Sequence, residues 1–331
     1  MIKKIIIFIN FIKDLVLARF DKNYTGSEKS YYVMRYLFKI SNGKLLNFLG
    51  KIVKASSNPF LFNKSYKILN FIDKETVTKL KDELLKLNIS TNEKYNQNQP
   101  IKFINKFENS EIDYEYYKKF NAVRLNFDNK DILSNKTISE FIINRNFSET
   151  IDKIVGAKTY LIATDAWITL PVPRVNDNYE EMTKHQETQM WHRDVDHLRD
   201  LKVFVYLNDV LDKQDGPFEI IEGTNCPDNF ENKNYIDKIK FRISNNFTKK
   251  NYEDKIRSIY GKEGTTFLAD TRAFHRGSVI INNRYRIVLM FYYSTHLFGK
   301  EKKITLEKNF ESYNLWKNQI RQNKYLSLFN I

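Results

Sequence analysis

The stretch "QMWHRDVDHLRDLKVFVYLNDV", Gln189 to Val210, joins a cluster of ionisable side chains directly to an apolar run. Its second half, "LKVFVYLNDV", is rich in β-branched and aromatic residues and predicts a buried β-strand. In its first half His192 and Asp194 are two residues apart, so on an extended chain their side chains lie on the same face. An imidazole and a carboxylate can therefore converge on one point beside a buried strand.

From residue 158 onward the sequence predicts mainly β-structure. The strand-like runs are bounded by Gly, Pro, Asn or Asp, and they read "KTYLIATDAWITL", "LKVFVYLNDV", "PFEIIEG", "GTTFLAD" and "RYRIVLMFYYS". Because turn-rich loops rather than regular helices separate them, they predict an antiparallel sandwich or barrel. A ligand would lie inside such a barrel.

The first 57 residues predict a basic helical extension. The chain has a net charge of +14, and residues 1–60 contain eleven Lys or Arg but only three acidic residues. This charge is not clustered beside a recognisable nucleic-acid-binding module, so we expect no nucleic-acid partner. Residues 58–300 then form the predicted β-rich domain, and residues 301–331 a predicted C-terminal helical tail.

Residues 1–20 have apolar side chains at helical spacing, namely Ile5, Ile9, Ile12, Val16 and Phe20. The uninterrupted apolar run is too short to span a bilayer, and charged residues and the lack of a cleavage motif disfavour a signal peptide. Two interpretations remain open. The helix docks on the protein's own core, or it lies on a membrane surface with its lysines toward the headgroups.

The single cysteine, Cys226, excludes an intramolecular disulfide framework and a cysteine-rich metal site. We therefore expect a reducing compartment and a cytoplasmic protein, at the inner membrane surface if residues 1–20 lie on lipid. Cys226 lies in the loop-like "GTNCPDN" and is not predicted to be a nucleophile.

A second histidine, His275, follows a predicted strand in "GTTFLADTRAFHRG". Together with His192 and Asp194 it makes a set of two histidines and one carboxylate, the facial ligation that suits non-haem Fe(II) and leaves three adjacent positions open. Zinc would accept the same ligands. The remaining histidines are predicted to be structural or surface residues, and they are His185, His197 and His296.

Arg286 lies 11 residues beyond His275, at the start of the apolar run "RIVLMFYY". A buried guanidinium needs an anionic partner, and its planar fork matches a carboxylate such as the distal carboxylate of 2-oxoglutarate. Zinc ligation alone would leave this arginine unexplained. Arg284 shares the same face by parity, so it remains an alternative anchor.

In these motifs the stretch from about 158 to 295 resembles the phytanoyl-CoA dioxygenase-like (PhyH) family of Fe(II)- and 2-oxoglutarate-dependent oxygenases. The resemblance is carried by "WHRDVD", by "DGPFEIIEGT", by "GTTFLADTRAFHRG" and by Arg286. It implies that residues 58–300 form a double-stranded β-helix, a jelly-roll or cupin-like barrel with flanking helices. It also implies that His192, Asp194 and His275 hold Fe(II) and that Arg286 binds 2-oxoglutarate. From its place on a predicted strand, Thr266 is expected to help Arg286.

The implied activity is hydroxylation of an unactivated C–H bond with O₂ and 2-oxoglutarate, releasing succinate and CO₂. The substrate class is a small or carrier-linked metabolite, such as a lipid or glycan precursor.

Two features of the sequence depart from the family pattern. Glu222 to Asn225 read "EGTN" where many members read Pro-Gly-Ser-His, and Arg193 is the middle residue of the H-x-D motif. Arg193 either faces outward or pairs with Asp196 or Asp200.

Other residues are candidates for contact with the substrate. The polar connection from Pro171 to Met190 is placed to cover the barrel mouth. Three basic residues are candidates to bind an anionic substrate, although ordinary solvated charges are the simpler interpretation: Arg174, Lys184 and Arg199. Two tryptophans, Trp167 and Trp191, either line the pocket or pack in the core.

Two other classes of protein stay open: a non-catalytic β-barrel binding protein, and a metal-dependent isomerase or hydrolase with the same ligand set.

Overall fold

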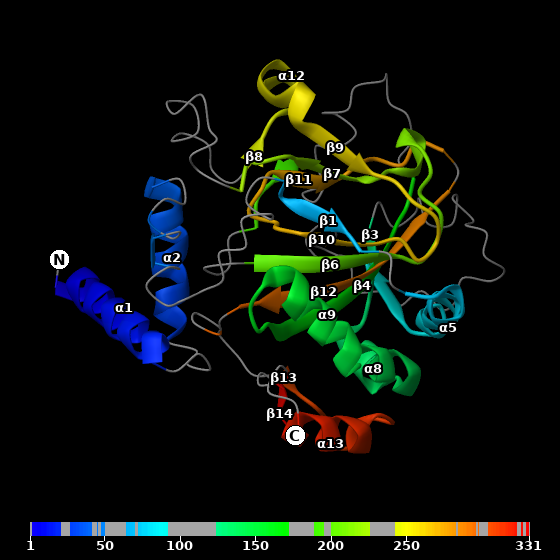
Figure 1. The fold of residues 1–331 in the computed structure, drawn as a ribbon, viewed down its shortest axis with the longest axis horizontal. Helices are drawn as coiled ribbons and strands as arrows, with labels where there is room; N and C mark the ends of the chain where they lie inside the picture. Colours follow the sequence, from blue (N-terminus) through cyan, green and yellow to red (C-terminus); the bar gives the residue numbers. More distant parts are fainter. Residues whose placement is uncertain are drawn as a thin grey trace.

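Two β-sheets form the body of the protein (Figure 1). The computed structural model describes residues 2–20, 27–41, 45, 48–49, 64–69, 72–91, 124–171, 189–194, 200–225, 242–282, 284–295, 297, 304–322, 326 and 329–330. The larger sheet runs in the order β1 (Tyr66–Ile68), β10 (Thr266–Ala269), β6 (Asp200–Tyr206), β12 (Arg286–Ser294), β4 (Tyr160–Thr169), β3 (Arg124–Phe127) and β2 (Ile89–Thr91). The smaller sheet runs in the order β8 (Arg242–Ile243), β5 (Trp191–His192), β11 (His275–Gly277), β7 (Phe218–Ile221) and β9 (Ile256–Ile259).

Every strand pair within these two sheets is antiparallel. The chain passes repeatedly between the sheets, because β4, β6, β10 and β12 belong to the larger one and β5, β7, β9 and β11 to the smaller one. The predicted mainly antiparallel fold with flanking helices is thereby confirmed. In the described part of the chain, ladders between named strands stay within one sheet, so the predicted barrel is not closed.

The two faces of the larger sheet have different partners because side chains alternate along each strand. Val203 of β6 and Leu289 of β12 belong to the outer face and pack in one core with five helices. Phe204 and Met290 belong to the inner face and pack with Phe218 of the smaller sheet. The helices of the outer core are α5 (Lys74–Leu84), α7 (Asn129–Ser134), α8 (Lys136–Ile142), α9 (Arg145–Val155) and α13 (Tyr313–Gln322).

At the start of α5 the Asp73 carboxylate caps the helix by accepting a hydrogen bond from the Thr76 backbone N–H. Glu75 and Lys79 of the same helix form an ion pair at 2.9 Å. The remaining short helices are η2 (Lys213–Asp215), α12 (Asn245–Tyr252) and η4 (Glu253–Lys255).

In the described part of the C-terminal tail lie the helix α13 (Tyr313–Gln322) and the parallel pair β13 (Ile304–Thr305) and β14 (Phe329–Asn330). Trp316 of α13 is fully buried, and its indole N–H lies 2.9 Å from the Ser139 hydroxyl of α8 and 3.2 Å from the Leu133 carbonyl of α7. The tail is thus helical only in part, and it packs on the same helices that cover the larger sheet.

At the other end, α1 (Ile2–Phe20) and α2 (Glu28–Ser41) lie side by side, apart from the sheets (Figure 1). The predicted helix is present, but its predicted apolar stripe from Ile5 to Phe20 is exposed. The buried side instead includes Phe11 and Asp14, and the Asp14 carboxylate accepts hydrogen bonds from Ser27 and Ser30 at the start of α2. In the part of the chain that the structure describes, no helix has the length and apolar character needed to cross a membrane.

Candidate metal centre

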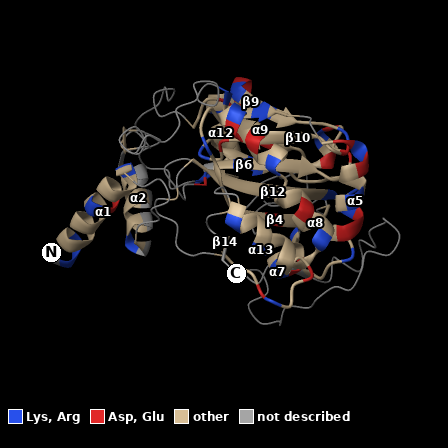
Figure 2. Cartoon of the chain, turned by 60° about the horizontal axis from the view of Figure 1, so that its bottom comes forward, with Lys and Arg blue, Asp and Glu red and all other residues tan. Residues whose placement is uncertain are grey.

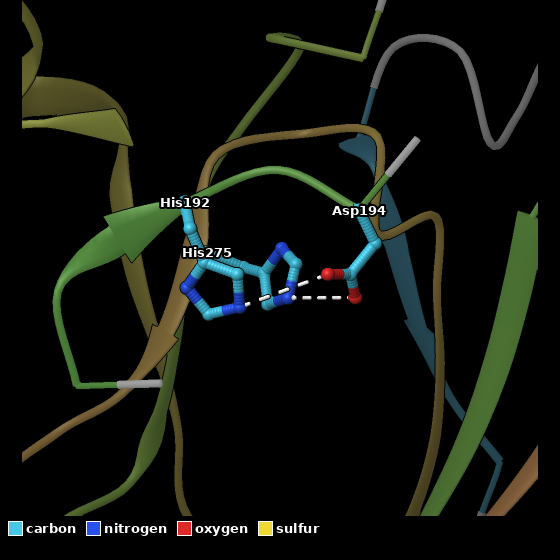
Figure 3. Close-up of side chains that lie close together, drawn as sticks. All are labelled: His192, Asp194 and His275. Atoms are coloured by element: carbon cyan, nitrogen blue, oxygen red, sulfur yellow. Dashed lines mark ion pairs between the residues drawn. The ribbon is translucent and has the colours of Figure 1, made fainter. Parts of the chain in front are cut away.

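The smaller sheet brings His192, Asp194 and His275 together (Figure 3). His192 on β5 and His275 on β11 are direct partners in the antiparallel register. Asp194 follows β5, and its backbone N–H donates to the Thr271 carbonyl at 2.9 Å. The Asp194 carboxylate lies 3.4 Å from Nε2 of His275 and 3.8 Å from Nε2 of His192. One ligand atom from each residue lies within 4.8 Å of the others, as a single metal site requires.

Backbone carbonyls hold the other nitrogen of each imidazole. Nδ1 of His192 lies 2.8 Å from the Met190 carbonyl oxygen, and Nδ1 of His275 lies 3.0 Å from the Ala273 carbonyl oxygen. A carbonyl only accepts hydrogen bonds, so each Nδ1 carries the proton and each Nε2 keeps its lone pair for a metal. Since each carbonyl belongs to the residue two positions earlier, the local backbone sets both ring orientations.

The electrostatic environment favours the protonation states that metal binding needs. Burial, together with the neighbouring His275 ring, lowers the pKa of His192 to about 3, so this imidazole is neutral at physiological pH. Burial acts to raise the pKa of Asp194, but the Lys202 ammonium and the His275 imidazole hold it well below its usual range. Nζ of Lys202 lies 2.6 Å from Asp194 Oδ2. Neutral imidazole and ionised carboxylate both bind divalent cations, so these residues fit a metal ion.

Arg286 lines the same cavity as His192, Asp194 and His275, a space of about 270 Å³ between the two sheets. It is buried, and its Nη2 lies 3.4 Å from the hydroxyl of Thr169, its register partner on β4. A side-chain carbon built on Gly277 of β11 would lie 2.7 Å from the same Nη2. The guanidinium therefore reaches across the sandwich to a place where only glycine leaves it room.

The other predicted anchor residues lie elsewhere. Arg284 is exposed, and its Nη1 lies 3.5 Å from the Asp215 carboxylate. Thr266 is fully buried, but it is not among the described residues that line the cavity, and its hydroxyl donates to the Gly264 carbonyl at 3.0 Å. Since its neighbour Phe267 occupies the inner face of β10, alternation places Thr266 on the outer face. The structure brings Thr169, not Thr266, to Arg286.

Arg193 lies on the side of the chain opposite to His192 and Asp194, as strand alternation predicts, but it is buried rather than exposed. It is buried against the ring of Phe274 at 3.9 Å and donates a hydrogen bond of 2.9 Å to the Thr224 carbonyl. Burial lowers its pKa to about 9. Thr224 belongs to the "EGTN" loop, so the two features that depart from the PhyH pattern contact each other.

Trp167 lines the cavity beneath the guanidinium of Arg124 at 4.0 Å, whereas Trp191 lies in a separate buried cluster. Three charged residues that line the cavity were not predicted from the sequence: Lys202, Arg124 and Asp165. Arg124 and Asp165 form an ion pair at 2.9 Å. The sequence carried a signal for two of them, because Lys202 and Asp165 are isolated charges within apolar strands.

Several predicted positions lie outside the described residues, namely Cys226, Arg174, Lys184, His185, Asp196, His197, Arg199, His296 and most of the connection from 171 to 190.

No protein-family model matches the chain, and no curated protein matches it in sequence. Similar solved structures include HygX from Streptomyces hygroscopicus with nickel and 2-oxoglutarate bound, at 10% identity and a TM-score of 0.44 over 71% of this chain and 85% of that one. AviO1 from Streptomyces viridochromogenes is 12% identical with a TM-score of 0.42, over 71% of this chain and 91% of that one. The non-heme alpha-ketoglutarate-dependent epimerase SnoN from nogalamycin biosynthesis is 9% identical with a TM-score of 0.42, over 77% and 83%. None of these similarities is strong enough to assign a reaction to this chain.

Proposed function

We propose that the protein is an Fe(II)- and 2-oxoglutarate-dependent dioxygenase that hydroxylates a C–H bond of a small or carrier-linked metabolite. The observation that carries the proposal is that one cavity is lined both by the His192, Asp194 and His275 set and by the buried Arg286. The strand order supports it, because β4, β12, β6 and β10 face β5, β11, β7 and β9 in the alternation of an eight-stranded jelly roll, the double-stranded β-helix.

Each residue has a separate part in this proposal. Nε2 of His192, Nε2 of His275 and a carboxylate oxygen of Asp194 would hold the metal, and Lys202 neutralises the other carboxylate oxygen. Arg286 would bind the distal carboxylate of 2-oxoglutarate. The Thr169 hydroxyl, which lies beside Arg286, would assist it in the role that we expected for Thr266 from the sequence. When bound, Fe(II) with 2-oxoglutarate and O₂ supplies the oxidation that converts C–H to C–OH and releases succinate and CO₂.

The cavity wall indicates a polar substrate. Arg124, Asp165 and Lys202 supply charged groups, and Trp167 and Phe204 supply aromatic surface that excludes water. A pocket with a few polar groups on an apolar lining is typical of sites for small molecules or for the end of a carrier-linked group, such as a lipid or glycan precursor.

Anaerobic titration of the full-length protein with Fe(II), with and without 2-oxoglutarate, tests this function. We expect a visible metal-to-ligand charge-transfer band only when both are present, and succinate release once air is admitted. A protein that binds Fe(II) without developing the band would be an isomerase or hydrolase with the same ligands. A protein that binds neither would be a non-catalytic binding protein.

Gly277→Ala should weaken 2-oxoglutarate binding. Its new methyl group would lie 2.7 Å from Nη2 of Arg286, so the guanidinium must move. Because small misplacements of a binding group cost up to about 100-fold, we expect the KM for 2-oxoglutarate to rise about tenfold to 100-fold. Fe(II) affinity without 2-oxoglutarate is the internal control and should not change. An unaltered KM would show that the position of Arg286 does not limit co-substrate binding.

A further inference from the structure

Helix α1 has two apolar sides, and only one of them is packed. At 3.6 residues per turn, Phe11, Leu15 and Ala18 lie on one side and are buried. This is also the side of Asp14, which accepts hydrogen bonds at the start of α2. The opposite side carries eight large apolar side chains, each at least 38% exposed: Ile5, Ile6, Phe8, Ile9, Ile12, Val16, Leu17 and Phe20. We call these eight residues the outer face. Soluble monomers rarely expose so many contiguous apolar side chains without a partner.

The outer face points away from the rest of the protein. In both views α2 lies between α1 and the two sheets (Figures 1 and 2). The helix is anchored in this position through Asp14, whose buried carboxylate accepts hydrogen bonds from the backbone N–H and hydroxyl of Ser27, both at 2.8 Å. Rotating α1 to bury its outer face would remove Asp14 from these donors, so the exposure is held by specific contacts.

The charges around the outer face indicate what covers it. The basic residues of α1 are all exposed, and they are Lys3, Lys4, Lys13 and Arg19. Asp14 is the single acidic residue of α1, and it is buried in the contact with α2. On the helical wheel Lys13 and Arg19 flank the central stripe of the outer face, and Lys3 lies on one border with the packed side. That stripe consists of Ile5, Ile9, Ile12, Val16 and Phe20. A second copy of the same face would bring like charges together, whereas a lipid surface with anionic headgroups would match both the apolar and the basic groups.

We propose that α1 binds the surface of an anionic phospholipid bilayer, with its outer face at the boundary between headgroups and acyl chains and its lysines on lipid phosphates. An apolar stripe flanked by basic residues is typical of helices that lie in the plane of a membrane. Each basic residue near an anionic surface strengthens such binding. The proposal concerns a surface remote from the metal centre in sequence, and it does not depend on the proposed oxygenase activity.

Flotation of the full-length protein with vesicles tests it. We expect the protein to float with phosphatidylcholine vesicles that contain phosphatidylglycerol, to float less as salt is raised, and not to float with phosphatidylcholine alone. Each Lys→Gln change at Lys3, Lys4 or Lys13 should weaken binding roughly fivefold. The double variant Ile9→Gln/Val16→Gln, which keeps the charge, should weaken it by about tenfold or more.

Leu211→Gln is the matched control, because Leu211 is an apolar residue outside α1 that is 50% exposed. It should float like the wild type, and the melting temperature of all variants should be unchanged because the altered residues are exposed. Failure of the wild type to float with anionic vesicles would overturn the proposal, as would normal flotation of the double variant. A wild-type dimer in sedimentation velocity that the double variant abolishes, without vesicle binding, would assign the outer face to a second copy instead.

Discussion

Asp194→Asn is expected to lower the affinity for Fe(II), or for Co(II) as a spectroscopic substitute, by about 100-fold or more. Removing even an outer partner of a metal ligand costs about 10–100-fold in affinity, and here a ligand itself loses its charge. The substitution keeps the shape of the side chain, and the amide oxygen can still accept from Lys202, which lies 2.6 Å from the carboxylate. Loss of binding would then reflect the missing anionic ligand rather than a collapsed site.

Asp165→Asn is the matched control for this experiment. Asp165 lines the same cavity, but it pairs with Arg124 and is not part of the cluster of potential ligands. Isothermal or Co(II) absorption titration should therefore show nearly wild-type metal affinity for Asp165→Asn. Equal losses in the two variants would indicate that only the overall negative charge of the cavity matters, and the assignment of Asp194 as a ligand would be wrong.

The sequence predicted the pieces of the metal centre better than it predicted the groups around them. His192 and Asp194 were paired by strand alternation alone, and the structure adds the register that sets His275 opposite His192. The carbonyls of Met190 and Ala273 could not be foreseen, because every residue has a carbonyl and only the turn of the chain decides which one faces a ring.

The main errors of prediction from the sequence concern the face of a strand or helix on which a residue lies. Thr266 was expected beside Arg286, but alternation cannot say which of two neighbouring residues points inward until the sheet's covered face is known. The same difficulty affected α1, where apolar residues lie on two sides of the helix and spacing alone does not select the packed side. The packed side of α1 is the one that carries Asp14, whose carboxylate accepts hydrogen bonds from Ser27 and Ser30 at the start of α2. No local sequence pattern links Asp14 to these serines.

Arg286→Ala is expected to weaken 2-oxoglutarate binding roughly 30-fold to several-thousand-fold, since truncating one partner of a buried, hydrogen-bonded charge pair costs about 2–5 kcal/mol. Arg284→Ala is the matched control, because Arg284 is exposed and its guanidinium contacts Asp215 instead of lining the cavity. The charge-transfer band, titrated with 2-oxoglutarate at saturating Fe(II), measures both variants. If the effects were reversed, Arg284 would be the anchor, and if neither variant changed the titration, the carboxylate would bind elsewhere in the cavity.

Arg286→Lys separates the charge of the anchor from its shape. An ammonium keeps the positive charge but offers no planar fork, so it cannot make two parallel hydrogen bonds to one carboxylate. It is also shorter than the guanidinium that reaches Thr169 on one side and the backbone of Gly277 on the other. We therefore expect Arg286→Lys to recover only a small part of the affinity that Arg286→Ala loses. Full recovery would mean that the cavity requires a cation at this end but not a fork, and the close fit between Gly277 and the guanidinium would then have another cause.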